Sequence, residues 1–231
     1  MILVFDINET LLDTAVLSPL FEKLFGKAAV RGEWFLTLEE TWMTATLAGR
    51  YLPFGLLAKS ALRQTGLRHG IHIDDDHQRE LTDMLAALPA HPDAAPALAE
   101  LRARGFQLTA LTNGTLETVQ HQLAHAGLDT SFDVILSVDS VETYKPSQPA
   151  YQYVADHWQV STRELVMIAA HGWDLIGAAS AGCRTGFIAR PGKVIDPQLF
   201  EPDWQADSLI ALSRQLMEEI SPNSGEAICK G

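Results

Sequence analysis

Four polar segments of the sequence carry side chains that are able to do chemistry together. The residues concerned are two carboxylates, one lysine, two hydroxyls and one amide: Asp6 and Thr10 in "FDINETL", Thr112 and Asn113 in "LTNGT", Lys145 in "YKPSQPAY" and Asp174 in "AAHGWDLIGAASAG". Carboxylates next to a lysine and a hydroxyl are able to carry nucleophilic or acid–base reactions. The chemistry requires that residues far apart in the sequence meet in space.

The order of apolar and helical stretches predicts that they do meet. Apolar runs at 2–5, 106–112, 132–137, 164–170 and 185–190 are typical of strands, with helical patterns of about 10–15 residues between them. This alternation predicts an α/β fold with a Rossmann-like, doubly wound parallel sheet. Ligands bind beyond the carboxyl ends of the strands in such a sheet. Asp6, Thr112 and Asp174 follow strand ends, and Lys145 follows the third strand, so we expect all four at one edge.

One interval is far longer than a crossover helix requires. Residues 14–88, between the first two predicted strands, contain four helical patterns separated by glycine and proline. We predict a helical cap over 14–88, inserted into a core made of 1–13 and 89–220, and a flexible tail at 221–231. The run Asp74-Asp75-Asp76 is expected to begin a helix, where negative charge suits the helix dipole.

Composition and charge exclude several classes of function. The 231 residues carry a formal net charge of -12, which argues against a nucleic-acid partner, because phosphate backbones need a basic surface. No apolar stretch is long enough to span a membrane, and no basic segment typical of a secretory signal precedes the first strand. The cysteines Cys183 and Cys229 are too few for a disulfide framework, so we expect free thiols and a cytoplasmic protein. Exposed apolar residues on the cap helices are compatible with a homodimer.

The four motifs, in this order and each after a predicted strand, resemble those of the haloacid dehalogenase superfamily over nearly the whole chain. The segments "LSVDSVETYKP", "GWDLIGA" and "PDW" at 202–204 look most like those of the type II (L-)2-haloacid dehalogenases. The resemblance implies a hydrolytic dehalogenase of small, anionic 2-haloalkanoic acids. Its reaction would pass through an aspartyl ester and need neither a metal nor another cofactor.

The resemblance also implies a role for each motif residue. Asp6 would be the nucleophile that attacks the carbon bearing the halogen. Lys145 would keep Asp6 ionised, Thr10 would supply a hydroxyl donor, and Asp174 would orient or deprotonate the water that hydrolyses the ester. The positions expected to contact the substrate are Asn8, Thr112, Asn113, Tyr151, His171 and Phe35.

Asn8 separates this chain from most of the superfamily, whose members are magnesium phosphatases. Those enzymes carry a second aspartate at this position, which protonates the leaving oxygen, and an acidic pair in the fourth motif. Asn8 has no proton to exchange at pH 7, and Ala169 and Ala170 stand where the earlier acid of the pair would lie. A halide leaving group needs no protonation, so these losses are tolerable for dehalogenation.

Four positions also depart from the dehalogenases, which usually have a tyrosine at the position of Asn8 and a serine at that of Ala169. Phe35 follows Trp34 where that family has a halide-binding arginine, with Arg31 nearby, and His171 replaces an asparagine. For His171 three roles stay open: a donor to the leaving group, a partner of Asp174, or a structural loop residue.

Two other functions stay open from the sequence alone. One is a Mg²⁺-dependent phosphatase of the same superfamily, and the other is a catalytically silent protein that keeps the fold and binds small anions. Structural roles compete at single residues as well. Thr10, Thr112 and Asp174 are candidates for helix caps, and Tyr151 is a candidate for core packing.

Overall fold

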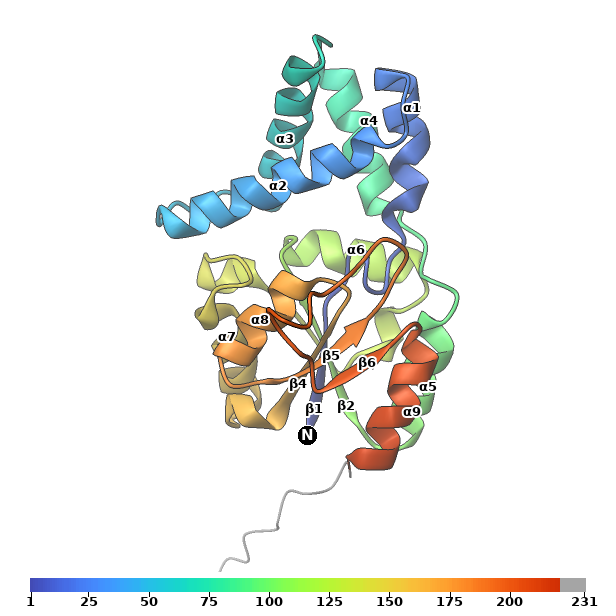
Figure 1. Ribbon diagram of the computed structural model, residues 1–231, viewed down its shortest axis with the longest axis vertical. Coiled ribbons are helices and arrows are strands. Elements are labelled where there is room, and N and C mark those ends of the chain that lie inside the picture. Colours follow the sequence, from blue (N-terminus) through green and yellow to red (C-terminus); the bar gives the residue numbers. More distant parts are fainter. Residues whose placement is uncertain (221–231) are drawn as a thin grey trace, which may run out of the picture.

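A six-stranded parallel sheet is the centre of the computed structural model, which describes residues 1–220 (Figure 1). In spatial order the strands are β3 (Val134–Ser137), β2 (Gln107–Thr112), β1 (Ile2–Phe5), β4 (Leu165–Ala169), β5 (Arg184–Ile188) and β6 (Trp204–Ala206). Every neighbouring pair is parallel. The predicted α/β class and Rossmann-like sheet are confirmed. The predicted tail at 221–231 and Cys229 lie outside the described residues.

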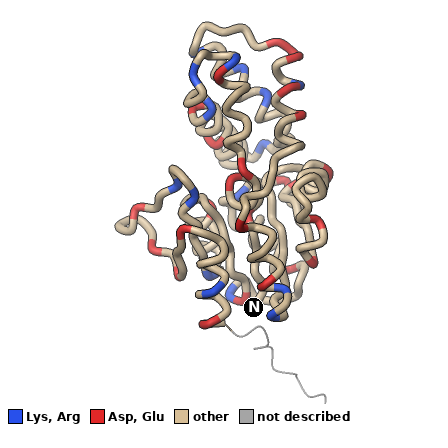
Figure 2. Tube along the Cα trace, turned by 90° about the vertical axis from the view of Figure 1, so that its right-hand side faces the viewer, with Lys and Arg blue, Asp and Glu red and all other residues tan. Residues whose placement is uncertain are grey.

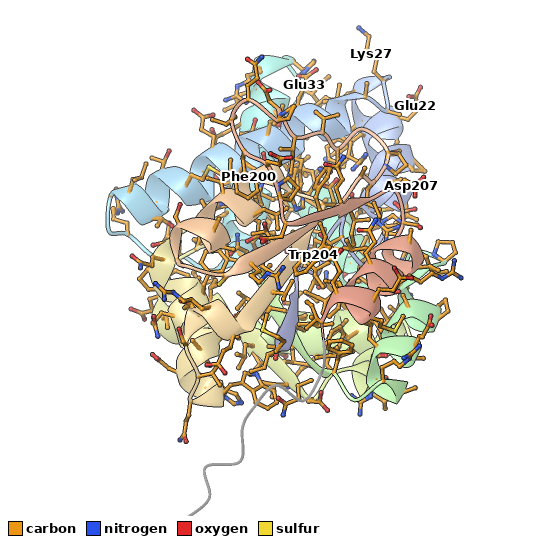
Figure 3. All side chains as sticks on the ribbon, turned by 60° about the horizontal axis from the view of Figure 1, so that its bottom comes forward. Glu22, Lys27, Glu33, Phe200, Trp204 and Asp207 are labelled. Atoms are coloured by element: carbon orange, nitrogen blue, oxygen red, sulfur yellow. The ribbon has the colours of Figure 1, made fainter. Side chains whose placement is uncertain are left out.

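The five predicted strands are confirmed with ends that differ by two residues at most, but the sixth strand is new. β6 has only three residues, of which Gln205 is exposed, so it shows no apolar run. Its one buried side chain is Trp204, whose Nε1 donates to Oε2 of Glu219 at 2.9 Å (Figure 3). The guanidinium of Arg184 lies 3.9 Å from the centre of the Trp204 ring, which ties β6 to β5.

Helices cover both faces of the sheet. α5 (Ala94–Ala103) packs against α9 (Leu209–Glu219) on one side, and α7 (Gln148–Trp158) packs against α8 (Gly172–Ser180) on the other (Figure 1). α6 (Leu116–His125) follows β2 and packs against β3. Because both faces are covered, β1 and β4 are buried along their whole length. Side chains of these central strands are therefore able to reach a ligand only at the strand ends.

Four helices between β1 and β2 lie together beyond the carboxyl ends of the strands, at the top of Figure 1. They are α1 (Ser18–Phe25), α2 (Val30–Leu47), α3 (Phe54–Arg68) and α4 (Asp75–Ala86). α2 packs along α3, and Nε1 of the buried Trp34 donates to the carbonyl of Ala58 at 3.1 Å. Asp74 caps α4 by accepting a hydrogen bond from the backbone N–H of His77 at 2.9 Å. The acidic run therefore begins a helix, as expected.

Short 3-10 turns complete the connections: η1 (Thr14–Leu17), η2 (Asp129–Ser131), η3 (Val138–Val141) and η4 (Thr162–Glu164). Acidic and basic residues are interspersed over the helices α1–α4 and the sheet with its covering helices in the view of Figure 2. Among the helices of residues 1–220, none is both long and apolar enough to cross a bilayer. Cys183 is buried and forms no disulfide.

Candidate active site

The carboxyl ends of β1, β2 and β4 meet below the cap helices, and the side chains that follow them surround a small cavity. Its volume is about 20 Å³, which is room for one water. The lining residues come from the strand ends and the segments that follow them, from α2 and α3, and from the first turn of α8: Asp6, Asn8, Phe35, Trp42, Phe54, Thr112, Asn113, His171 and Trp173. The structure brings all ten predicted site residues to this region. Six of them line the cavity, and the other four (Thr10, Lys145, Tyr151 and Asp174) connect to Asp6 through hydrogen bonds.

Asp6 is fixed by the sheet and held by three donors. Its backbone N–H donates to the carbonyl of Ile168 at 3.0 Å. Oδ1 accepts a hydrogen bond from Nζ of Lys145 at 2.8 Å, and Oδ2 accepts one from the Thr10 hydroxyl at 2.6 Å and lies 3.1 Å from Nδ1 of His171. Burial alone would raise the pKa of Asp6, but the charges of Lys145 and His171 and their hydrogen bonds hold it well below its usual range. The carboxylate is ionised and faces the cavity.

Lys145 uses all of its N–H groups. Nζ lies 2.8 Å from Oδ1 of Asp6, 2.7 Å from Oδ2 of Asp174 and 3.1 Å from the carbonyl of Leu111. Burial lowers the pKa of Lys145, but the two carboxylates more than offset this and raise it. An ammonium group has three donors, so Lys145 is a fully engaged cation that cannot also bind a substrate directly.

The backbone around Lys145 is held from two sides. Asn113 accepts from the Lys145 backbone N–H at 2.9 Å and donates from Nδ2 to its carbonyl at 3.4 Å. Gly177 on α8 lies so close to Pro146 that a Cβ added there would be 2.4 Å from Cβ of Pro146. The side chain of Asn113, expected to contact substrate, is therefore engaged in placing Lys145.

Asp174 lies in the first turn of α8 but does not cap that helix. Its Oδ2 accepts from Lys145, and its Oδ1 accepts from the Tyr151 hydroxyl at 2.7 Å. Burial raises the pKa of Asp174 and the charge of Asp6 raises it further, against the opposite effect of Lys145. Burial also raises the pKa of Tyr151, which is therefore a neutral donor. Neither residue is among those that line the cavity. The Tyr151 hydroxyl contacts Asp174, and the substrate contact expected for Tyr151 stays a prediction.

Thr10 is oriented by two hydrogen bonds. Its hydroxyl accepts from the backbone N–H of Ala170 at 2.9 Å and donates to Oδ2 of Asp6. Because the acceptor position is occupied by Ala170, the hydroxyl proton points at Asp6. Thr112 reaches the cavity from the end of β2. Asn8 also lines the cavity, and its Oδ1 accepts a hydrogen bond from Nε2 of Gln122 on α6 at 3.3 Å.

His171 lies between two carboxylates. Nδ1 is 3.1 Å from Oδ2 of Asp6, and Nε2 is 3.0 Å from Oε2 of Glu9. Phe35 stacks on the ring at a centroid distance of 5.8 Å. Burial alone would lower the pKa of His171, but the hydrogen bonds to Asp6 and Glu9 raise it to about 9. The sequence left open a role of His171 as a partner of Asp174. In the structure its two ring nitrogens contact Asp6 and Glu9 instead.

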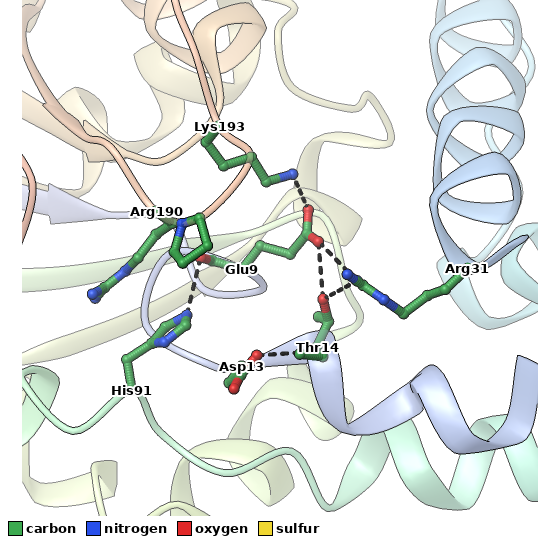
Figure 4. A pocket seen from close by; sticks show the side chains of 9 residues that line it. Glu9, Asp13, Thr14, Arg31, His91, Arg190 and Lys193 are labelled. Atoms are coloured by element: carbon green, nitrogen blue, oxygen red, sulfur yellow. Dashed lines mark hydrogen bonds and ion pairs between the residues drawn. The ribbon is translucent and has the colours of Figure 1, made fainter. Parts of the chain in front are cut away.

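Glu9 is a site residue that the sequence reasoning missed. It is buried, and its backbone is left-handed with a φ of 63°. Oε2 pairs with His171 and with Nζ of Lys193, and Oε1 accepts from the Thr14 hydroxyl at 2.9 Å and from Arg31 at 3.3 Å (Figure 4). Arg31 therefore reaches Glu9 and not the small cavity. The only signal in the sequence was an acid three residues after the presumed nucleophile.

Comparison with known proteins agrees with this geometry. The model of the haloacid dehalogenase-like hydrolase family matches residues 1–182. The (S)-2-haloacid dehalogenase of Pseudomonas sp. (strain YL) is 32% identical over 190 residues, which cover 82% of this chain and 80% of that protein. The (S)-2-haloacid dehalogenase 4A of Burkholderia cepacia is 32% identical over 225 residues, which cover 94% and 95%.

The solved structures show the same likeness. The L-2-haloacid dehalogenase from Xanthobacter autotrophicus with chloropropionic acid covalently bound superposes with a TM-score of 0.85 at 26% identity, over 95% of this chain and 100% of that one. A family match over most of the chain, relatives above 30% identity and a shared fold agree with one another. The chain belongs to the haloacid dehalogenase-like hydrolase family.

Proposed function

We propose that the chain hydrolyses the carbon–halogen bond of small 2-haloalkanoic acids through an ester formed on Asp6. The observation that carries the proposal is an ionised carboxylate, paired with Lys145, that faces a cavity walled largely by aromatic rings. The relatives named as (S)-2-haloacid dehalogenases support it. So does the related structure with covalently bound chloropropionic acid, since a covalent adduct is what a nucleophile produces.

In the first half-reaction an oxygen of Asp6 attacks the carbon that bears the halogen. The new C–O bond forms as the C–halogen bond breaks, and the halide leaves with the electron pair. Lys145 keeps Asp6 ionised, and Thr10 fixes its orientation. A halide ion is a very weak base, so the absence of an acid at Asn8 does not hinder its departure.

In the second half-reaction water attacks the carbonyl carbon of the ester and releases a 2-hydroxy acid. We assign the role of base to Asp174, because it is the second carboxylate of the site and Nζ of Lys145 bridges it to Asp6 at 2.7 and 2.8 Å. Burial also raises its pKa toward the range of a proton acceptor. Tyr151 holds Asp174 through its hydroxyl, and Lys145 connects Asp174 to Asp6. Both half-reactions proceed without a step that requires a metal ion.

We assign the substrate carboxylate to the side of the cavity formed by Asn8, Thr112 and the backbone next to Asn113, and the alkyl group to Phe35. Residues 14–88 are proposed as the cap. Because the cavity admits one water and a haloacid is several times larger, we expect the cap helices to move away from the sheet when substrate enters. A homodimer and a cytoplasmic location stay predictions from the sequence.

The test is halide release from 2-chloropropionate and from chloro- and bromoacetate by the purified protein. Asp6→Asn removes the nucleophile, and we expect turnover to fall by a factor of about 10⁴ or more. The matched control is Asp76→Asn, which changes an exposed aspartate on α4 and leaves turnover unchanged. Intact-mass measurement on brief mixing detects the ester. A wild-type protein that releases no halide from any short haloacid would reject the proposal.

The magnesium-dependent phosphatase is not favoured by these residues. Asn8 occupies the position of the phosphatase acid, and Ala169 and Ala170 leave the acidic pair incomplete. Within residues 1–220 no group of three or more His, Cys, Asp or Glu is placed to hold a metal ion. Chelator-sensitive hydrolysis of an aryl phosphate without halide release would point to that function instead. A silent anion-binding protein would release neither product.

A further inference from the structure

The two oxygens of the Asp6 carboxylate are held differently. Oδ2 lies 2.6 Å from the Thr10 hydroxyl and 3.1 Å from Nδ1 of His171, whereas Oδ1 has one donor, Nζ of Lys145 at 2.8 Å. A carboxylate oxygen offers about two lone-pair positions. Both positions on Oδ2 are occupied, and one on Oδ1 stays free. Oδ1 is therefore the oxygen able to attack carbon, and Oδ2 becomes the carbonyl oxygen of the ester.

We propose that His171, kept protonated by Glu9, acts with Thr10 as the oxyanion site for hydrolysis of that ester. The inference rests on the proposed function and deepens it, because it names the group that stabilises the second half-reaction. His171 contacts the reacting oxygen and is a catalytic residue in this scheme. Glu9 acts through His171 and is a positioning residue.

Once the ester has formed, the chemistry places a full negative charge on Oδ2 at one stage only. When water attacks Cγ of Asp6, the π electron pair of the ester C=O bond moves to Oδ2. When that pair returns, the Cγ–Oδ1 bond breaks, and Oδ1 leaves as the hydroxyl oxygen of the 2-hydroxy acid. One water proton reaches this hydroxyl through the base assigned to Asp174, and the other is released to solvent as Asp6 ionises. Donors already 2.6 and 3.1 Å from Oδ2 need little movement to stabilise the oxyanion.

The surroundings of His171 require a charged ring. Both ring nitrogens lie within hydrogen-bond distance of a carboxylate oxygen, and a neutral imidazole has only one N–H to offer. The two contacts are both satisfied when both nitrogens carry a proton. The rings of Phe35 and Trp173 stack on His171 at 5.8 and 5.1 Å, and aromatic faces attract a cation.

Glu9 is the carboxylate that remains when Asp6 has become a neutral ester. Without it, the imidazolium would then lose its last negative partner and release its proton. Glu9 is unable to swing away easily, because His171, Thr14, Arg31 and Lys193 hold its two oxygens. Its left-handed backbone, which non-glycine residues rarely adopt, places the side chain under His171. These contacts therefore hold the Glu9 carboxylate in place beside the His171 ring.

The first experiment separates the two half-reactions with Glu9→Gln and His171→Gln. Rapid mixing with 2-chloropropionate is expected to give a burst of about one halide per protein, followed by steady-state turnover lowered by a factor of about 10². Intact-mass spectra are expected to show the Asp6 ester accumulating. The matched control is Glu33→Gln, which breaks an exposed Glu–His pair, Glu33 with His69 at 2.7 Å, on the outer side of the cap (Figure 3). We expect this control to turn over without an accumulated ester.

The second experiment is the pH profile of ester hydrolysis, which a merely structural role of Glu9 would not shift. In the free protein the pKa of His171 is about 9, and it is lower in the ester, because Asp6 no longer carries a charge. The rate of ester hydrolysis is expected to fall as the pH rises through this lowered pKa, and Glu9→Gln is expected to move the fall to still lower pH. The charged groups around His171 come from four segments, which are the loop after β1, the helix α2 and two further loops: Asp6, Glu9, Arg31, Glu39, Lys145 and Lys193. If His171→Gln no longer shows the fall of the hydrolysis rate with rising pH, the fall is due to the His171 ring and not to these neighbouring groups.

Three results overturn the inference while leaving the proposed function intact. The first is an unchanged steady-state turnover in both variants. The second is a first halide release that is slowed as much as turnover, with no accumulated ester. The third is a wild-type rate of ester hydrolysis that does not fall as the pH rises from neutral to above about 9. Should Glu9→Gln fail to fold, the wild-type profile and His171→Asn still decide the matter. A wild-type protein that forms no ester and releases no halide overturns the proposed function itself.

Discussion

Two cavities lie on opposite ends of the Glu9–His171 pair, and they differ in size, lining and exposure. The cavity on the Asp6 side has a volume of about 20 Å³ and mostly aromatic walls. The cavity on the Glu9 side has a volume of about 240 Å³ and a charged lining that includes Arg31, Arg190 and Lys193 (Figure 4). The Lys193 side chain is 23% exposed and that of Arg31 is 25%, whereas that of Lys145 beside Asp6 is fully buried.

The difference shows that volume does not locate the reaction. In the small cavity the charges are few, buried and paired at short distances, so each acts at full strength on Asp6. In the large cavity Arg31 and Lys193 are partly exposed, and both hold Glu9, which lies in its wall. The large cavity thus stabilises the outer end of an ion pair whose inner end contacts the nucleophile. The comparison is open to test by matched changes on the two sides.

The largest difference is expected between two lysine substitutions. Lys145→Met removes the cation between Asp6 and Asp174, so two buried carboxylates face each other, and breaking a buried pair in this way costs about 3–5 kcal/mol. We expect turnover to fall at least about 10³-fold and the unfolding midpoint to drop. Lys193→Met in the large cavity removes a partly exposed partner of Glu9, and we expect a loss of about tenfold or less. Equal losses for the two variants would remove the distinction between the cavities.

The pH dependence of the unfolding free energy is expected to reveal the protonation of His171, the member of the Glu9–His171 pair that contacts Asp6. The pKa of His171 is about 9 in the folded protein and about 6.5 in an unfolded chain, so folding takes up a proton. The resulting stabilisation, about 3 kcal/mol, is complete below about pH 6.5 and is lost as the pH rises through about 9. Denaturant unfolding of the wild type and of His171→Gln measures it. The difference in unfolding free energy between the two proteins should shrink across this interval. A constant difference would show that the ring is neutral.

Replacing a glycine by alanine is expected to change the stability of the protein in opposite directions near the two cavities. Gly177→Ala places a Cβ 2.4 Å from Pro146 and shifts the Lys145 segment, so we expect a cost of about 1–3 kcal/mol together with lower turnover. Gly32, in the helix α2, has open space around it, and Gly32→Ala is expected to stabilise the protein by up to about 1 kcal/mol. Thermal unfolding and halide release on both variants check the pair. A neutral Gly177→Ala would mean that α8 is able to move without disturbing Lys145.

The sequence predicted the fold and the inner part of the site because both follow from strand topology. Apolar runs located five strands, and the rule that parallel strands end at one edge placed Asp6, Lys145 and Asp174 together. Spacing along the chain does not reveal which side chains form pairs. Glu9 was missed because its partner Lys193 lies 184 residues away. The pairing of Tyr151 with Asp174 was not predicted either, because the position of a residue in a motif does not fix the direction of its hydroxyl.

The smallest effect is expected from Trp42, which lines the small cavity and carries an unused donor. Its Nε1 and Oδ1 of Asp93 are the buried side-chain polar atoms of residues 1–220 that have no hydrogen-bond partner. A buried N–H without a partner is unfavourable, and an anionic substrate above Asp6 would bring an acceptor to this wall. Trp42→Phe removes the N–H and keeps an aromatic ring, so we expect KM to rise about three- to tenfold at nearly constant kcat. The control is Trp158→Phe, whose Nε1 already donates to Thr109 at 2.8 Å away from the cavity, and which should leave KM unchanged. If Trp42→Phe leaves KM unchanged as well, the donor serves neither substrate nor product, and the small cavity recognises its ligand without help from α2.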